Sequence, residues 1–179
     1  LACLLELHQN PFFRLLVVDA RTYHDTATSM ASGAWRMEGP FWQPPLYSFF
    51  LSAIYRIFGS SPMAARVVQA ILGSISAALV FRLGERMAGR RAAWIAWGMA
   101  ALYAPFIYFD LQLLNAGLVT VLLLCALDWA LAWSVTGRPR DMILAGVSLG
   151  FASITVATSL VLVPVFAIWV WRRQRAAAA

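Results

Sequence analysis

The stretch LQLLNAGLVTVLLLCAL, residues 111–127, decides the class of fold because it contains no charged residue. Residues 92–109 and 142–171 are two further runs without a charge, and residues 67–81 form a fourth, shorter run. A helix needs about 20 mostly apolar residues to cross the hydrocarbon core of a bilayer. The runs therefore predict an all-α integral membrane protein, a helical bundle with several spans.

Composition and charge agree with a membrane protein. Of the 179 residues, 61% are hydrophobic and 12% are charged, and the mean hydropathy is +0.72. A soluble domain carries about 25% charged residues. The net charge of +6 comes from Arg alone, since the sequence contains no Lys, and these Arg cluster in short segments between apolar runs. The positive-inside rule expects this of cytoplasmic loops, so we predict no nucleic-acid partner.

The runs divide the chain into the parts of one transmembrane domain, residues 1–179, which we interpret as an N-terminal fragment of a longer protein. Residues 1–9 are expected to end a first span. Residues 10–61 are expected to form an extracytoplasmic loop that carries short interfacial helices and the catalytic residues. Spans are then expected at residues 62–82, 92–109 and 113–135. The Arg-rich turns between these spans place the loop on the outside.

The last apolar run allows two interpretations. Residues 142–171 are too many for one straight span, and a single crossing would place the following Arg172 and Arg173 outside, against the positive-inside rule. Two half-depth helices with a break at residues 155–159 would return these Arg to the cytoplasm. A long tilted span and a helical hairpin both remain open at this point.

Two short helices are expected in the loop. Residues 22–34 read as a polar helix ending near Gly33, and Pro45 suits the first turn of a helix over residues 46–58. That second helix is too short to cross a membrane and suits its surface. Its polar residues Ser48, Ser52 and Arg56 follow one another at intervals of four.

Asp19 is the residue in the loop best suited to chemistry. It follows the apolar residues 15–18, so its carboxylate is expected at the membrane surface, where partial desolvation suits a general base. Tyr23 would lie one helical turn away, with His24 on a neighbouring face. The alternative role for Asp19 is structural, as a cap at the start of the helix.

Two further acids precede or occupy apolar runs. Asp110 and Gln112 form a polar patch with Asn115 on the same side of the membrane as Asp19, and Asn115 lies deep enough to need a partner. Asp128 lies inside a span near its cytoplasmic end, and we predict a structural pairing with an Arg. Cys3 and Cys125 imply no disulfide framework, and the sequence contains no metal-binding spacing.

A series of short motifs carries a resemblance over nearly the whole chain. They are DARTYHDTA (19–27), SGAW (32–35), PFWQPPLY (40–47), YRIFG (55–59), RVVQAILG (66–73), LYAP (102–105) and YFDLQLL (108–114). In order and spacing they resemble the membrane glycosyltransferases of the GT-C type, in the family 39 branch related to dolichyl-phosphate-mannose protein mannosyltransferases.

The resemblance implies transfer of a sugar from a polyprenyl-phosphate donor to a protein or glycan acceptor, outside the cytoplasm and with inversion at the anomeric carbon. Asp19 matches the catalytic acid of the family and would be the general base. Arg21 or Arg36 would hold the phosphate, since guanidinium groups match its oxygens. Further substrate contacts are expected from Tyr23, His24, Gln43, Asp110 and Gln112. The implied location is a bacterial inner membrane, with lipid around the spans and the Asp19 loop in the periplasm.

The chain departs from the family pattern at three places. Ala20 stands where many relatives have a second acid, which argues against a divalent metal as cofactor. Asn115-Ala116 and Val156-Ala157 replace an acid and an Arg-Pro pair that relatives often carry. Two alternatives to the enzyme follow: a non-catalytic membrane protein, such as a lipid-carrier transporter or scaffold, and a degenerate relative that binds the lipid-linked sugar without transferring it.

Overall fold

The structure is a computed structural model that describes residues 16, 18–34 and 43–178. The expected end of a first span at residues 1–9 and the candidate Arg36 therefore lie outside the described residues. Every element of the described part is helical, which confirms the all-α prediction. The elements are α3 (Asp19–Ala31), α4 (Pro45–Phe58), α5 (Pro62–Ala88), α6 (Arg90–Leu102), α7 (Ala104–Leu111), α8 (Ala116–Thr136), α9 (Pro139–Thr155), the 3-10 helix η1 (Ala157–Val161) and α10 (Leu162–Ala178).

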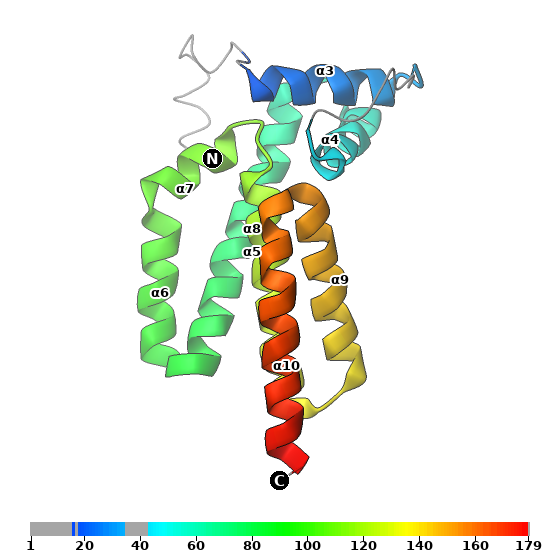
Figure 1. The fold of residues 1–179 in the computed structure, drawn as a ribbon. Coiled ribbons are helices and arrows are strands. Elements are labelled where there is room, and N and C mark those ends of the chain that lie inside the picture. Colours follow the sequence, from blue (N-terminus) through cyan, green and yellow to red (C-terminus); the bar gives the residue numbers. More distant parts are fainter. Residues whose placement is uncertain (1–15, 17, 35–42, 179) are drawn as a thin grey trace.

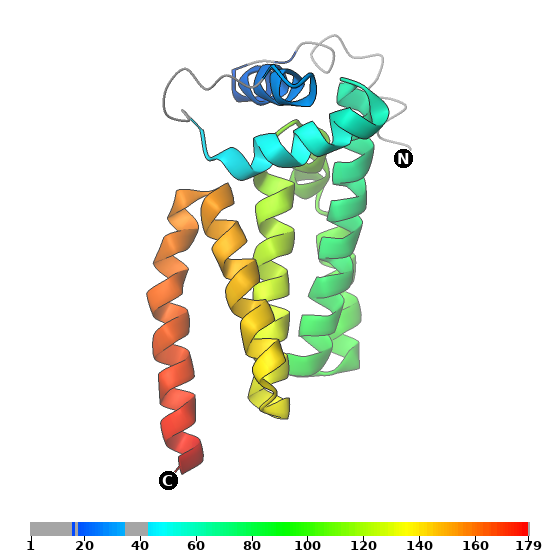
Figure 2. The ribbon, with the colours of Figure 1, turned by 90° about the vertical axis from the view of Figure 1, so that its right-hand side faces the viewer.

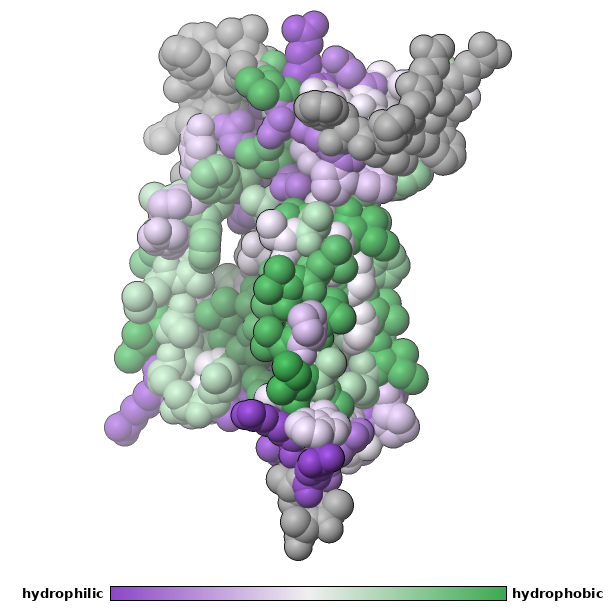
Figure 3. Space-filling view, viewed as in Figure 1, coloured by the Kyte–Doolittle hydropathy of each residue, from purple (hydrophilic) through white to green (hydrophobic). Residues whose placement is uncertain are grey.

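The helices form two layers. The bundle helices α5, α6, α8, α9 and α10 stand upright and roughly side by side, whereas α3 and α4 lie across one end of them (Figures 1 and 2). We call this end the outer end and the opposite end, where α5, α8 and α10 finish, the Arg-rich end. Figure 3 shows an apolar surface along the upright helices and polar side chains towards both ends, as a membrane protein requires.

The surface helix α4 begins at Pro45, where the fixed φ of proline suits the first turn. Its serines Ser48 and Ser52 are buried at 3% and 5% exposure, while Ile57 and Phe58 are exposed. The guanidinium of Arg56 donates to the carbonyl oxygen of Met30 in α3, at 3.3 Å. The two serines of the stripe thus face protein, Arg56 bonds the backbone of α3, and the exposed apolar side chains Ile57 and Phe58 lie at the end of α4.

Two helices, α5 and α8, are long and apolar enough to cross a membrane among the residues that the structure describes. The run at residues 92–109 is divided between α6 and α7, which are bent by 52° at Tyr103 and count as a third span only if taken together. The physical reason is Pro105, which has no N–H to bond the carbonyl oxygen of residue 101 and whose ring would clash with that carbonyl in a continuous helix.

The chain reverses direction between α9 and α10, so these two helices form a hairpin (Figures 1 and 2). Val156 leaves the helical region with φ −146° and ψ 118°, and η1 completes the turn. The reversal returns Arg173 to the Arg-rich end, where its guanidinium donates to the carbonyl oxygen of Ser134 at 2.8 Å. Of the two interpretations of residues 142–171, the structure contains the hairpin. Its depth in the membrane remains a prediction.

Candidate functional site

Asp19 is the first residue of α3, at the outer end of the molecule. The N-cap position belongs to Val18, and no side chain caps this helix, so Asp19 is not the capping residue of the alternative interpretation. Val18 has a φ of 49°, which is uncommon for a β-branched residue. The carboxylate of Asp19 is exposed and lies in the first turn, where the helix dipole favours a negative charge.

Gln43, two residues before α4, forms a hydrogen bond with the Asp19 carboxylate. Its side-chain Nε2 donates to Oδ1 of Asp19 at 2.9 Å, which joins two predicted site residues separated by 24 positions in the chain. Among the described residues, no cation forms an ion pair with Asp19. A carboxylate held by a neutral donor keeps an acceptor oxygen for a proton, which is what a general base needs.

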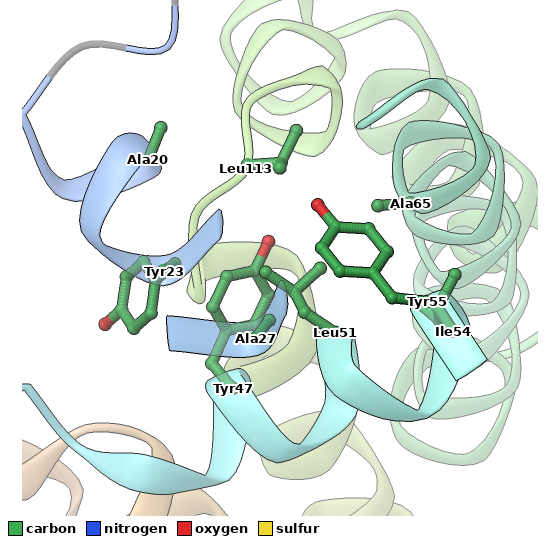
Figure 4. Close-up of a cluster of buried hydrophobic side chains, with 9 residues drawn as sticks. All are labelled: Ala20, Tyr23, Ala27, Tyr47, Leu51, Ile54, Tyr55, Ala65 and Leu113. Atoms are coloured by element: carbon green, nitrogen blue, oxygen red, sulfur yellow. The ribbon is translucent and has the colours of Figure 1, made fainter. Parts of the chain in front are cut away.

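The two surface helices pack on one another through a cluster of buried aromatic and small side chains. The rings of Tyr23 and Tyr47 meet edge to face, with centroids 4.7 Å apart. Burial raises the pKa of Tyr23, of Tyr47 and of Tyr55, the last to about 12, so all three phenols stay neutral over the physiological range. Figure 4 shows the cluster, which consists of Ala20, Tyr23, Ala27, Tyr47, Leu51, Ile54, Tyr55, Ala65 and Leu113.

His24 lies inside this packing. Its Nδ1 and the hydroxyl of Tyr55 are 2.8 Å apart, and their rings are also in edge contact. The hydrogen bond ties α3 to α4, so the structure gives His24 a local packing role. Its predicted contact with substrate stays a prediction.

Asn115 connects the surface layer to the bundle. Its side-chain Nδ2 donates to the hydroxyl of Tyr23 and to the backbone oxygen of Thr155, both at 3.2 Å. One amide thus joins α3, the start of α8 and the end of α9. The sequence indicated that Asn115 needs a partner, but it did not indicate which groups these are.

Gln69 is a residue that the sequence analysis missed. It is fully buried in α5, and its side-chain Nε2 donates to the backbone oxygens of Gln112 and Leu114, both at 3.0 Å. These bonds fix the connection between α7 and α8. The available signal was an amide inside an apolar run, since a buried amide requires partners. Through these bonds Gln112 has a backbone role, and its expected side-chain contact with substrate remains a prediction.

Arg21 lies two positions after Asp19 on α3, which places it on the far side of the helix. It forms an exposed ion pair with Asp25 at 3.7 Å, one turn further along. The structure therefore does not bring Arg21 and Asp19 together. Its role as a phosphate contact is an untested prediction.

Asp110 is half-buried near the end of α7. Its carboxylate lies directly against two glycines, Gly73 of α5 and Gly117 of α8, where a Cβ would leave no room for it. It lines a groove between α5, α6, α7 and α8. Within the described part of the chain, no hydrogen bond or ion pair joins Asp110 to Asp19 or Gln43.

Asp128 is buried at 2% exposure in α8, near the Arg-rich end. Its carboxylate pairs with Arg82 at 2.9 Å and Arg86 at 3.0 Å, and Arg86 also donates to the backbone oxygen of Asp128 at 2.7 Å. The prediction of a structural pairing with an Arg is confirmed.

The described residues contain no group of three or more His, Cys, Asp or Glu side chains placed to hold a metal ion. Ala20, at the position where the resemblance implies a second acid, is buried in the cluster beneath α3. The side chain at this position thus points into the protein and away from the exposed Asp19 carboxylate.

These features define an integral membrane protein built of helices. Its two surface helices, α3 and α4, cover one end of the candidate spans. Residues 42–178 match a family model described as dolichyl-phosphate-mannose-protein mannosyltransferase, and this match covers more than half of the chain. The chain belongs to that family of membrane glycosyltransferases, which use a lipid-linked sugar donor, and the predicted resemblance is confirmed. No curated protein and no solved structure matches it.

The family match divides the candidate site. Gln43, Asp110 and Gln112 lie within residues 42–178, whereas Asp19, Arg21, Tyr23, His24 and Arg36 lie before them. The roles of the α3 residues thus depend on their geometry and on the motifs around Asp19.

Proposed function

We propose that this protein transfers a sugar from a polyprenyl-phosphate donor to a protein or glycan acceptor, on the extracytoplasmic face of a bacterial inner membrane. The observation that carries the proposal is the exposed Asp19 carboxylate at the outer end of the molecule. Gln43 bonds one of its oxygens, and no cation pairs with it among the described residues. A carboxylate so placed can accept the proton of an incoming hydroxyl.

In the proposed reaction, the acceptor hydroxyl gives its proton to Asp19 as its oxygen attacks the anomeric carbon. The bond between this carbon and the phosphate oxygen breaks, and the polyprenyl phosphate leaves with the bonding electron pair. Attack opposite the leaving group inverts the anomeric centre. Gln43 acts as a positioning residue, since its amide fixes one oxygen of Asp19 and leaves the other for the acceptor.

The orientation rests on the distribution of Arg. Arg82 and Arg86 end α5, Arg90 and Arg91 begin α6, and Arg138 and Arg140 lie at the turn into α9, all away from α3. The positive-inside rule assigns such turns to the cytoplasm. The Asp19 layer then faces the periplasm, where a lipid-linked sugar could approach from the membrane and an acceptor from the aqueous side.

The test compares two acidic residues of the same surface helix in the full-length protein. We expect Asp19→Asn to lower transfer from a radiolabelled polyprenyl-phosphate sugar by roughly a hundredfold to ten-thousandfold, the usual contribution of a general base. Asp25→Asn is the matched control, because Asp25 is also exposed on α3 but is paired with Arg21. It should retain activity near that of the wild type.

Gln43→Leu should lower the turnover number more than it changes the donor KM, because it leaves the Asp19 carboxylate in place but unpositioned. The anomeric configuration of the product, measured by NMR, should be opposite to that of the donor. Full activity in Asp19→Asn, or an equal loss in Asp25→Asn, would contradict the assignment of Asp19. A product with retained configuration would contradict the single displacement.

A further inference from the structure

The groove that contains Asp110 has a volume of about 820 Å³ and is formed by α5, α6, α7 and α8. Its walls are small and apolar side chains, among them Ile71, Ala77, Trp97, Ala101, Phe106 and Leu124. Figure 3 shows the molecule hollowed between the side formed by α6 and α7 and the central helices. The volume lies in the usual range for sites that bind small molecules.

Asp110 is the one ionisable residue among the described side chains that line this groove. Its carboxylate has no hydrogen bond or ion pair with any described residue, and glycine backbone lies against both of its oxygens. A charge held against apolar walls without a partner is unfavourable.

The negative charge of Asp110 indicates which head groups the groove could bind. No Arg or His is among its described lining residues, and the remaining polar side-chain groups are the hydroxyls of Ser74, Ser76 and Thr120 and the indole N–H of Trp97. A carboxylate repels a phosphate, which makes the groove unsuited to the phosphate of a polyprenyl donor. A positively charged head group would supply the missing counter-charge, and an apolar chain would fill the walls.

We propose that this groove binds a membrane amphiphile with a primary-ammonium head group, with the ammonium on Asp110 and the chain along α5 and α8. The geometry that carries the proposal is one unpartnered carboxylate at the edge of an apolar groove between candidate spans. The groove is distinct from the Asp19 carboxylate, because Asp19 and Gln43 are not among its lining residues and the two carboxylates share no contact among the described residues.

The experiment measures binding to the full-length protein in detergent, by native mass spectrometry. Three probes with the same chain are compared: hexadecylamine, hexadecanol and hexadecyl phosphate. We expect hexadecylamine to bind roughly tenfold to a hundredfold more tightly than hexadecanol, as a hydrogen bond to a charged group allows. Hexadecyl phosphate resembles the donor of the proposed sugar transfer, so it should bind outside the groove, and Asp110→Asn should leave its binding unchanged.

Two variants test the head-group and chain parts of the groove separately. Asp110→Asn should remove the preference for the amine while leaving hexadecanol binding unchanged. Ala77→Leu should weaken hexadecylamine and hexadecanol, because it narrows the groove and leaves the carboxylate intact. Asp25→Asn is the control for a general loss of negative charge at the outer end and should change nothing.

Equal binding of hexadecylamine and hexadecanol by the wild type, or an unchanged amine preference in Asp110→Asn, would overturn the proposal. The absence of any probe binding would overturn it as well, since it would mean that the groove is filled or closed in the full-length protein. Sugar transfer is measured in parallel with Ala77→Leu. Weaker binding of hexadecylamine and hexadecanol by this variant, with transfer retained, would support a groove that is separate from the transfer site.

Discussion

Asp110 and Asp128 occupy opposite ends of the same bundle and differ in what neutralises them. Asp128 is buried, and the guanidinium groups of Arg82 and Arg86 lie within 3.0 Å of its carboxylate. Asp110 is half-buried against glycine backbone and has no cation among the described residues. The first arrangement joins α5 to α8, whereas the second leaves a charge available. Asp128 therefore stabilises the packing of two helices, whereas Asp110 is the acid to which we assign a ligand.

The two ends also use different forces to hold their helices. At the Arg-rich end, ion pairs join α5 to α8, for example between Arg82 and Asp128, which are 46 positions apart in the chain. At the outer end, hydrogen bonds do this instead: Asn115 bonds Tyr23 and Thr155, His24 bonds Tyr55, Gln69 bonds Gln112, and Arg56 bonds the backbone of Met30. Among the described residues, these contacts leave the Asp19 carboxylate without a cation. The comparison predicts different responses of the two ends to mutation and to pH.

The largest effect is expected at the Arg-rich end. The double variant Arg82→Leu, Arg86→Leu leaves the buried Asp128 carboxylate without a cation, which costs about 3–5 kcal/mol of unfolding free energy. Thermal unfolding of the purified protein in detergent measures this loss. Adding Asp128→Leu to the double variant should restore most of the stability, because no unpaired charge then remains. A double variant as stable as the wild type would remove the distinction between the two ends.

Alkaline pH should loosen the outer end before the Arg-rich end. Burial raises the pKa of Tyr23, Tyr47 and Tyr55 above the ordinary value of 10.0, to about 12 for Tyr55. Each phenol therefore stabilises the folded state fully below pH 10.0. This contribution falls as pH rises from 10.0 towards the folded pKa, because the unfolded chain loses its protons first.

Tyr23, Tyr47 and Tyr55 all pack between α3 and α4, and none of them lies at the Arg-rich end. Hydrogen exchange should consequently show α3 and α4 opening as pH rises above 10.0 while α5 and α8 remain protected. Tyr55→Phe should make this transition less steep, and Tyr108→Phe, at an exposed position, should not. Simultaneous opening of all helices would contradict the separate forces at the two ends.

The third effect concerns Asn115, whose amide supplies two donors. Asn115→Leu should lower the unfolding free energy by about 1–3 kcal/mol, because it leaves the buried Thr155 oxygen without its side-chain donor. Asn115→Asp should be similarly harmful, since a carboxylate cannot donate to that oxygen. Limited proteolysis within α3 measures the release of the surface layer. Unchanged cleavage in both variants would mean that Asn115 does not hold α3.

The smallest effect is expected at Asp110 and has the opposite sign to that at Asp128. Asp110→Asn removes an unpartnered carboxylate from apolar surroundings and should raise the unfolding free energy by about 1 kcal/mol. Functional residues are often kept at such a cost in stability. Thermal unfolding in detergent measures the change in stability of Asp110→Asn, with Asp25→Asn as the control for the loss of an exposed carboxylate. A clear loss of stability would show that Asp110 also has a structural partner.

Sequence reasoning located most helices because their signals are local. The charge-free runs predicted α5 and α8, and Pro45 marked the first residue of α4. The polar helix expected at residues 22–34 is α3, which begins three positions earlier at Asp19. The division of residues 92–109 into α6 and α7 was missed, although Pro105 was visible in the sequence. The hairpin at residues 142–171 could be stated only as one of two alternatives.

The sequence by itself determined the membrane class, the positions of the apolar helices and the gathering of Arg at their turns. Hydropathy, proline and charge act over a few residues, so these features can be recognised in any short window of the chain. Tertiary structure alone decided the partners: Asn115 meets Tyr23 across 92 positions, and Asp128 meets Arg82 across 46. It also decided that Asp110 lies against glycines and Asp128 between arginines. The partners of a carboxylate depend on which helices pack beside it, and packing is a property of the whole bundle.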